Sequence, residues 1–309
     1  MDTLLFTHPA CIGHDTGPGH PERPDRLRAV LTALEEESFA LLQRREAPEA
    51  TVEQIARAHP EGFVRRLLAA VPTEGLRSID ADTILSPGSG QAVLRAAGAN
   101  CAAVDAVLAG EARNAFCAVR PPGHHAETAR AMGFCLFNSV AVAAMHARMA
   151  HGLSRIAVVD FDVHHGNGTQ DIFWSEPDLF YASTHQSPLY PGTGDAEETG
   201  VAGNIVNAPL PPGSGGVAFR RAMERVVLPA LDDFAPELVL ISAGFDAHSR
   251  DPLAHLELVE ADFAWATLEI MALADRHCDS RVVSSLEGGY DLRGLALSAA
   301  AHVQALMTG

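Results

Sequence analysis

The sequence contains no lysine, so arginine alone carries its positive charge. All 22 basic residues are arginines, against 39 aspartates and glutamates, which gives a formal net charge of −17. A surface this acidic repels a phosphate backbone, which argues against direct binding of nucleic acid. The same charge attracts cationic molecules by long-range steering. The composition therefore favours basic peptides or polyamines over nucleic acid as partners.

Cysteines are few and scattered along the chain. The five of them form no C-x-x-C pair, and their odd number argues against a disulfide framework or a zinc knuckle. The first ten residues show no basic stretch followed by an apolar one, so no signal peptide is expected. No apolar run reaches the roughly 20 residues needed to span a bilayer. We therefore expect a cytoplasmic protein that does not enter membranes, and the sequence leaves its oligomeric state open.

No internal repeat, low-complexity tract or Ser/Gly linker divides the chain, so residues 1–309 are expected to form a single domain. Short β-branched runs alternate with longer segments rich in Ala, Leu and Arg at helical spacing. Several of these runs are apolar throughout, which suits strands buried on both faces. The alternation predicts an α/β fold with a predominantly parallel central sheet and helices on both faces.

The predicted elements have the following bounds. The strands are Leu4–Thr7, Ala115–Val119, Ile156–Phe161, Leu179–Ser183, Leu238–Ser242 and Val282–Leu286. The helices are Glu22–Glu37, Gln91–Leu108, Ser139–Met149, Ala218–Phe234, Ala261–His277 and Arg293–Leu306.

Five of the predicted strands are each followed by a segment that combines Gly with His, Asp or Tyr. The segments are Arg120–His125, Asp162–Gly168, Thr184–Gly194, Ala243–His248 and Glu287–Tyr290. In open parallel sheets, ligands bind at the carboxyl ends of the strands. The sequence therefore predicts that one edge of the sheet carries the functional site.

The segment after Ile156–Phe161 has the pattern of a metal site. Side chains alternate across a strand, so Asp160, Asp162 and His164 point to the same face. Asp246, which follows another buried strand, completes an Asp/His/Asp set, although solvated carboxylates at a strand end are the simpler interpretation of the first segment alone. Three N/O ligands with an open position match a catalytic zinc site rather than a structural one. Two carboxylates also suit Fe(II), Mn(II) or Co(II), so the pattern predicts a metal more firmly than its identity.

The adjacent pair His124 and His125 follows a rigid Pro-Pro-Gly turn. Adjacent histidines are most often simple loop residues. Beside a metal, however, two imidazoles can supply a general base and an acid or electrostatic partner at neutral pH. Each ring then needs an orienting group on its far nitrogen, and Asp160 and Asn167 are the available candidates.

Three aromatic residues lie in Gly- or Pro-containing loops at the same predicted edge. Tyr290 could place a phenolic donor on an oxyanion, since the glycines before it allow close approach of the backbone. Phe134 and Tyr190 could wall a narrow apolar channel, or they could belong to the core.

Together these segments resemble the histone deacetylase family, the zinc-dependent amidohydrolases that include the acetylpolyamine amidohydrolases. The residues within these motifs are most similar to those of the class II branch and its bacterial relatives. The matching stretches span most of the chain in the family's order: His20–Pro24, Arg120–Glu127, Met132–Asn138, Asp160–Thr169, Tyr190–Gly194, Ser242–His248 and Leu286–Tyr290.

The resemblance implies one zinc ion per chain, an amide-hydrolysing activity that releases acetate, and a role for each matching residue. It implies that the zinc ligands are Asp162, His164 and Asp246. It implies that the catalytic residues are His124, His125 and Tyr290, with Asp160 behind the first histidine and Asn167 behind the second. The first branch of the family has Asp where Asn167 stands, so His125 is expected to be less basic here because an amide stabilises imidazolium poorly.

The resemblance also implies a substrate tunnel and a second cation. The tunnel would be walled by Phe134 and Tyr190, with the Gly133 carbonyl accepting the N–H of the scissile amide. A structural potassium ion would be held by the backbone carbonyls of Asp160, Asp162, His164 and Thr184 and by the Ser183 hydroxyl. The expected substrate is an acylated lysine peptide or a small acylated amine. Leu253 stands where polyamine-selective relatives can place a Glu, which mildly favours acyl-lysine over acetylpolyamine.

Two further interpretations stay open on the sequence. A binuclear-metal ureohydrolase has a related architecture, but it needs a D-x-H-x-D run, and here Asp162 and His164 are followed by Gly166 rather than Asp. A non-catalytic acyl-lysine binder on the same fold is argued against by the complete set of metal ligands, paired histidines and Tyr290.

Overall fold

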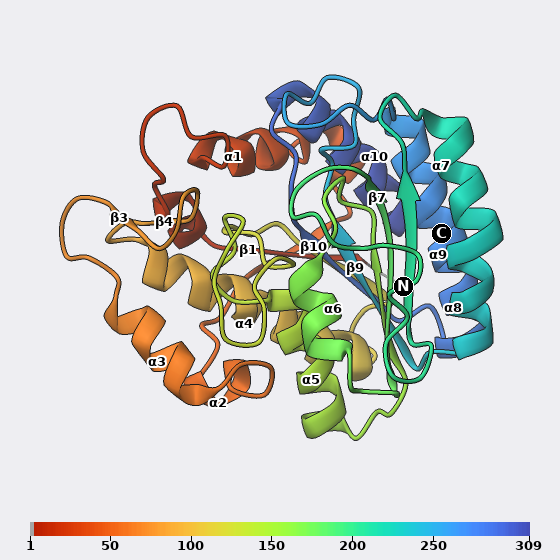
Figure 1. Ribbon diagram of the computed structural model, residues 1–309, viewed down its shortest axis with the longest axis horizontal. Helices are drawn as coiled ribbons and strands as arrows, with labels where there is room; N and C mark the ends of the chain where they lie inside the picture. Colours follow the sequence, from red (N-terminus) through yellow and green to blue (C-terminus); the bar gives the residue numbers. More distant parts are fainter. Residues whose placement is uncertain (1–2) are drawn as a thin grey trace.

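A sheet of eight parallel strands forms the centre of the computed structural model, which describes residues 3–309 (Figure 1). The α/β fold with a parallel sheet, predicted above, is confirmed. From one edge to the other the strands are β2 (Gln43–Glu46), β1 (Thr3–Thr7), β5 (Asn114–Cys117), β10 (Val282–Leu286), β9 (Leu238–Ala243), β6 (Ile156–Asp160), β7 (Leu179–Gln186) and β8 (Ile205–Leu210).

Helices cover both faces of the sheet (Figure 1). One face carries three helices, of which the first two pack on each other: α4 (Ser89–Leu108), α5 (Ser139–His151) and α6 (Asn167–Phe173). The opposite layer runs across the sheet as α1 (Pro24–Ala33), α10 (Leu292–Thr308), α9 (Glu260–Cys278), α8 (Leu228–Phe234) and α7 (Gly216–Ala222). The smaller elements are α2 (Val52–Ile55), α3 (Glu61–Ala69) and the hairpin of β3 (Arg77–Ser78) with β4 (Ile84–Leu85).

The six predicted strands are all present, and the two strands of the main sheet that were missed lie at its two edges, while the strands of the β3–β4 hairpin were also not predicted. β2 has the sequence QRRE, with no apolar residue, because it pairs only with β1 and leaves its side chains to solvent. β8 pairs only with β7, and its Asn207 and Pro209 interrupt the apolar pattern. The central strands β6, β9 and β10 are buried throughout, which explains why their sequences are continuously apolar.

Two of the predicted helices need correction by more than two residues. The helix expected over Glu22–Glu37 ends at Ala33, and it begins at Pro24 because proline lacks an N–H and suits the first helical position. The helix expected over Ala218–Phe234 is α7, a π-helical turn at Met223–Val227 and then α8, and Leu228 donates its N–H to the Met223 carbonyl five residues earlier. Within residues 3–309, no helix is long and apolar enough to cross a membrane.

Candidate active site

A pocket of about 230 Å³ opens where the loops after the strands meet. Most of its lining residues are ones that the sequence analysis singled out, although they come from segments far apart in the chain. Asp82 and Leu189 were not predicted, since neither belongs to a recognisable motif. The lining residues are Asp82, His125, Gly133, Phe134, His164, Leu189, Tyr190, Leu253 and Tyr290.

The three predicted metal ligands are buried and converge on one point. Asp162 Oδ1 lies 3.1 Å and Asp246 Oδ2 lies 3.0 Å from Nδ1 of His164. A single ring nitrogen carries at most one hydrogen, so it cannot satisfy both carboxylates, whereas a divalent cation between the three atoms would. Two carboxylates and one imidazole form a donor set that suits Zn²⁺ with open coordination positions. These residues therefore fit the metal that the family pattern implies.

Glycines and backbone donors fix the two carboxylates. A Cβ added at Gly244 would collide with the Asp162 carboxylate, and one at Gly288 with the Asp246 carboxylate. The Gly288 N–H donates to Asp162 Oδ2 and the Val163 N–H donates to Asp246 Oδ1, each at 2.8 Å. Because one oxygen of each carboxylate is held by the backbone, the other is oriented toward His164 and a cation.

His124 is oriented by a buried carboxylate. Its Nδ1 lies 2.9 Å from Asp160 Oδ2, which also accepts the Tyr181 hydroxyl at 3.1 Å. A carboxylate only accepts, so Nδ1 carries the hydrogen and Nε2 faces Asp162 Oδ2 at 3.8 Å. Burial alone would lower the pKa of His124, but the charges of Asp162 and Asp160 raise it to about 10. Asp160 therefore lies where the sequence predicted it.

His125 is oriented by a chain of two further residues. Its Nδ1 lies 2.8 Å from Asn167 Oδ1, while the amide nitrogen of Asn167 donates to Glu127 Oε1 at 2.8 Å. Because Glu127 accepts from the amide nitrogen, the Asn167 oxygen must face His125, so Nδ1 of His125 carries the hydrogen and Nε2 has the free lone pair. Burial, together with the neighbouring His124 and His164, lowers the pKa of His125 well below its usual value. Glu127 was not predicted, although it stands in the Arg120–Glu127 stretch.

Tyr290 lines the same pocket as His125 and His164. Burial raises the pKa of its hydroxyl well above the usual value, so the hydroxyl stays a donor. Its backbone N–H donates to Asp251 Oδ2 at 2.7 Å, and the ring packs at 5.8 Å from that of Phe134. The Arg26 guanidinium stacks over the Tyr290 ring at 4.8 Å.

A buried ionic cluster supports the loop that carries Tyr290. Arg26 donates to the carbonyls of Glu287 and Gly289 at 2.5 Å each, and to Glu22 Oε1 at 3.0 Å. Arg120 donates to both oxygens of Glu22, one of them at 2.7 Å. Burial would raise the pKa of Glu22, but Arg120 above all lowers it to about 2. The i, i+4 spacing of Glu22 and Arg26 was the available sequence signal for this cluster.

The two predicted aromatic walls reach the pocket by different routes. Gly133 and Phe134 adopt positive φ angles of 56° and 67°, a sharp turn that a Cβ at residue 133 would block by contacting the His125 ring at 2.6 Å. Tyr190 comes from the loop after β7, and its ring centroid lies 5.1 Å from that of His125. The pocket therefore has apolar sides and a polar, titratable end.

The residues expected to hold potassium lie on neighbouring strands, since Asp160 of β6 pairs with Ser183 of β7. The buried Thr184 hydroxyl has no hydrogen-bond partner within residues 3–309, and the Ser183 hydroxyl lies 2.9 Å from His185 Nδ1. Potassium binding stays a prediction.

A second His/Asp group lies on the outer surface of α4 and α5. Asp105 Oδ1 lies 2.7 Å from Nε2 of His146 and 2.6 Å from Nε2 of His151. Arg57 donates to Nδ1 of His146 at 2.6 Å, so Nε2 of that ring must carry the hydrogen that Asp105 accepts. These hydrogen bonds complete the group, and a metal-ligating ring would instead donate from its far nitrogen.

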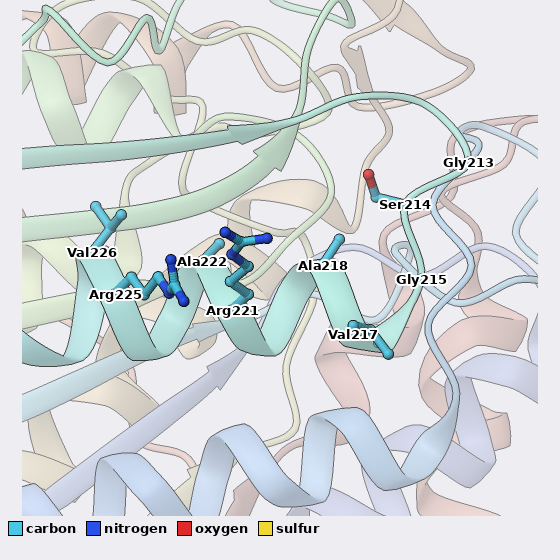
Figure 2. A pocket seen from close by; sticks show the side chains of 10 residues that line it. Gly213, Ser214, Gly215, Val217, Ala218, Arg221, Ala222, Arg225 and Val226 are labelled. Atoms are coloured by element: carbon cyan, nitrogen blue, oxygen red, sulfur yellow. The ribbon is translucent and has the colours of Figure 1, made fainter.

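A wider hollow of about 740 Å³ runs along α7 and the π-helical turn that follows it, where Figure 2 shows the side chains of Arg221 and Arg225. Its lining has no carboxylate, histidine or cysteine side chain, so it offers no group for acid–base or metal chemistry.

Comparisons with known proteins agree with the motifs. Residues 20–306 match the family model of the histone deacetylase domain. The chain is 40% identical to the histone deacetylase-like amidohydrolase of Pseudomonas aeruginosa, over 93% of this chain and 81% of that protein. It is 39% identical to a probable deacetylase of Archaeoglobus fulgidus, over 95% of this chain and 83% of that protein.

A further relative and a solved structure are similar to nearly the whole chain. The chain is 40% identical to histone deacetylase 14, chloroplastic, of Arabidopsis thaliana, over 98% of this chain and 76% of that protein. The crystal structure of the HDA15 HD domain superposes with a TM-score of 0.93 at 35% identity, covering 99% of this chain and 88% of that one.

Proposed function

This chain belongs to the histone deacetylase family, and from that premise we propose that it is a zinc-dependent deacylase acting on N-acyl-lysine or a similar acylated amine. Membership of a family of deacetylases and amidohydrolases supports an enzyme that hydrolyses amides. The metal, the residue roles and the substrate are the parts proposed here.

One observation carries the proposal: the pocket is apolar along its sides and reactive at its end. Phe134, Leu189, Tyr190 and Leu253 line the sides, and a flexible alkyl chain fits between such walls. Such a shape admits an acyl group on a slim amine and presents its amide to the end of the pocket, where His125 and Tyr290 lie.

The metal ligands would be Asp162, His164 and Asp246. When bound there, zinc supplies Lewis acidity to the acetamide carbonyl and lowers the pKa of a water molecule. The free Nε2 of His125 is placed to take a proton from that water, because Asn167 holds its Nδ1 hydrogen on the opposite side. The oxygen of that water would bond to the acyl carbon as the C–N bond breaks, a protonated histidine of the His124–His125 pair would give a proton to the leaving amine, and acetate would be released.

Two groups orient the amide. The Tyr290 hydroxyl donates to the carbonyl oxygen as negative charge develops on it, because burial keeps the phenol protonated. The Gly133 carbonyl would accept the amide N–H, since the turn at Gly133 and Phe134 brings this backbone against His125.

The charge of the residues that line the pocket helps to decide between acyl-lysine and acetylpolyamine as the substrate. Asp82 is the one carboxylate among the pocket's lining residues other than the metal ligands, and Leu253 adds no charge. One carboxylate can attract a cation or accept a peptide N–H, whereas selection of a polyamine calls for an anionic or restricted entrance. We therefore propose acyl-lysine peptides or small acylated amines as substrates, with acetylpolyamines as the alternative.

Turnover of a fluorogenic acetyl-lysine amide by the zinc-loaded protein tests this proposal. We expect one zinc per chain by elemental analysis and inhibition by a hydroxamate. Asp246→Asn should lose both the metal and turnover, and Asp233→Asn, an exposed acid on α8, should lose neither. Two metals per chain, or full metal with no hydrolysis of any acylated amine, would contradict it. The ratio of kcat/KM for an acetylated peptide and N-acetylputrescine then separates the two substrate classes.

A further inference from the structure

Tyr190, which forms one wall of the pocket, lies in a loop that makes few hydrogen bonds. Residues 187–200, here called the Tyr190 loop, form the first part of the connection from β7 to β8 and contain no helix or strand. Within residues 3–309, the one hydrogen bond to residues 188–192 is from Gln186 Nε2 to the Pro188 carbonyl, at 3.4 Å. Apart from the packing of Leu189 on the hydrophobic core, the position of Tyr190 against His125 is therefore set by the ends of the loop.

The far end of the loop is tied down by a buried polar network. Thr193 Oγ1 lies 2.8 Å from His165 Nδ1, and the Gly194 carbonyl lies 2.9 Å from His185 Nε2. Gly194 has no room for a side chain, because a Cβ there would contact the His165 ring at 2.6 Å and His185 Nε2 at 2.5 Å. The loop backbone thus lies directly on two buried imidazoles whose centroids are 4.9 Å apart.

Glu198 closes this network. Its Oε2 accepts the Gln170 amide nitrogen at 2.6 Å and the Gly194 N–H at 3.0 Å. Gln170 lies on α6, so this single oxygen joins the loop to a helix that begins just beyond the metal-binding segment. Asn207 of β8 adds a third tie, donating to Gln170 Oε1 at 2.8 Å and to the Glu198 carbonyl at 3.3 Å.

The direction of each hydrogen bond follows from the carboxylate. Because Glu198 accepts from the Gln170 nitrogen, Gln170 Oε1 must accept from Nε2–H of His165, 3.0 Å away. His165 Nδ1 is then an acceptor for the Thr193 hydroxyl. The Glu198 carboxylate therefore sets the direction of a chain of hydrogen bonds. The chain runs from Thr193 in the loop to His165, then to Gln170 on α6, and returns to the loop at Glu198.

We propose that Glu198 is a positioning residue for substrate binding: by clamping the Tyr190 loop to Gln170, it holds the Tyr190 wall against His125. This inference rests on the proposed function for its kinetic consequence, but not for its structural one. Glu198 touches neither the pocket nor a metal ligand. Release of the wall would therefore weaken contacts made equally by bound substrate and transition state, which raises KM and leaves kcat nearly unchanged.

Amide hydrogen exchange provides the structural test, with no substrate required. In the zinc-loaded protein, Glu198→Ala should speed exchange across residues 187–200, because it removes two bonds to a charged acceptor. Glu197→Ala, the exposed neighbouring acid with no ion pair or hydrogen bond within residues 3–309, should leave exchange unchanged. Equal exchange in Glu198→Ala and wild type would overturn the clamp.

Kinetics on an acetyl-lysine amide test the positioning role. We expect KM to rise about tenfold in Glu198→Ala, the order expected for loss of a hydrogen bond to a charged group, with kcat within about twofold. Glu198→Gln should stay near wild type, because its amide oxygen can still accept from Gln170 and Gly194. In a Tyr190→Ala background, Glu198→Ala should raise KM by less than it does in the wild type, because Leu189 is then the one pocket-lining residue of the loop left to displace. An additive double variant, or a loss confined to kcat, would overturn the role.

The exchange and kinetic experiments distinguish failure of the proposed function from failure of the Glu198 clamp. If wild type hydrolyses no acyl-lysine amide, the proposed function fails, and the exchange result alone still decides whether Glu198 clamps the loop. If wild type is active and the loop loosens without a change in KM, the clamp exists but the positioning role is wrong.

Discussion

At the scale of single residues, Tyr290 is the group whose loss should separate catalysis from folding. Its hydroxyl is the protonated donor at the end of the pocket, and the ring is held by Phe134 and Arg26 whether or not the hydroxyl is present. Tyr290→Phe should therefore lower kcat by about 10² or more, as for loss of one oxyanion donor. Steady-state kinetics and thermal unfolding check this, and unchanged turnover with an intact fold would remove Tyr290 from the mechanism.

Asn167 should affect catalysis indirectly, because it orients the imidazole ring of His125. Its side-chain oxygen sets the tautomer of His125, and Glu127 in turn fixes which end of the amide faces that ring. Asn167→Ala frees the ring to adopt the other tautomer, so we expect a loss of about 10–100-fold in kcat, the usual cost of losing an outer partner. Asn167→Asp keeps the acceptor for His125 but turns its other oxygen toward Glu127 Oε1, so it should retain most activity only when combined with Glu127→Gln, whose amide nitrogen can donate to it. Equal kcat values for Asn167→Ala and wild type would contradict the assignment.

At the scale of elements, the two glycines of α4 should respond to alanine in opposite directions. In an open helix, Gly→Ala stabilises by up to about 1 kcal/mol. At Gly98, however, the new Cβ would collide with the Pro48 carbonyl of the segment that leads from β2 to α2, so we expect destabilisation by about 1–3 kcal/mol.

Gly90→Ala is the matched control in the same helix. Its new Cβ would meet only Val71 Cγ2 at 3.5 Å, an ordinary contact, so we expect no loss of stability and up to a modest gain. Chemical unfolding of the two variants gives the comparison. If Gly98→Ala is as stable as Gly90→Ala, the close approach of α4 to residue 48 does not constrain the fold.

The same scale shows what sequence reveals and what it does not. Central strands such as β6 and β9 are predictable because burial on both faces makes them continuously apolar, and their carboxyl ends locate the metal ligands. The edge strand β2 is not predictable from sequence, because its QRRE segment has no strand pattern and is extended only through pairing with β1. Asp82 was missed because it reaches the pocket from a segment with no motif, and Glu127, although it ends the Arg120–Glu127 stretch, was missed because its partner Asn167 lies 40 residues away in sequence.

At the scale of the whole molecule, the loops at the sheet edge are held from behind by buried charge. Glu22 accepts from both Arg26 and Arg120, and Arg26 holds the loop before Tyr290. Glu22→Gln would leave two buried guanidinium groups short of a negative partner. We expect a loss of about 3–5 kcal/mol in the free energy of unfolding, the usual result of breaking a buried pair.

Chemical denaturation measures this loss, and Glu61→Gln, which breaks an exposed pair with Arg65 on α3, is the control. That variant should change stability by less than about 1 kcal/mol. If both variants unfold at the same denaturant concentration as wild type, the cluster does not hold the fold.

Buried neutral histidines should make the whole fold sensitive to acid. Burial lowers the pKa of His302 to about 3 and that of His59 to about 4, against an ordinary value of 6.5. Thr267 donates its hydroxyl to the Phe263 carbonyl and so accepts from Nδ1–H of His302, which leaves Nε2 of the neutral ring to accept from the Ser284 hydroxyl. Since the unfolded chain takes up these protons first, the stabilisation is complete above pH 6.5 and is lost as pH falls toward 4 and then 3.

For each such histidine, the free energy of unfolding should fall by up to about 1.4 kcal/mol per pH unit. Each kcal/mol lost should lower Tm by roughly 2–4 °C. His302→Gln removes one titrating group, so its Tm should fall less steeply than that of wild type below pH 6.5. His255→Gln, at an exposed position, should follow wild type. Metal release at low pH affects all three proteins alike, so the difference between their curves isolates the histidine. Parallel curves for His302→Gln and wild type would show that His302 takes up its proton at the same pH in the folded and unfolded chain.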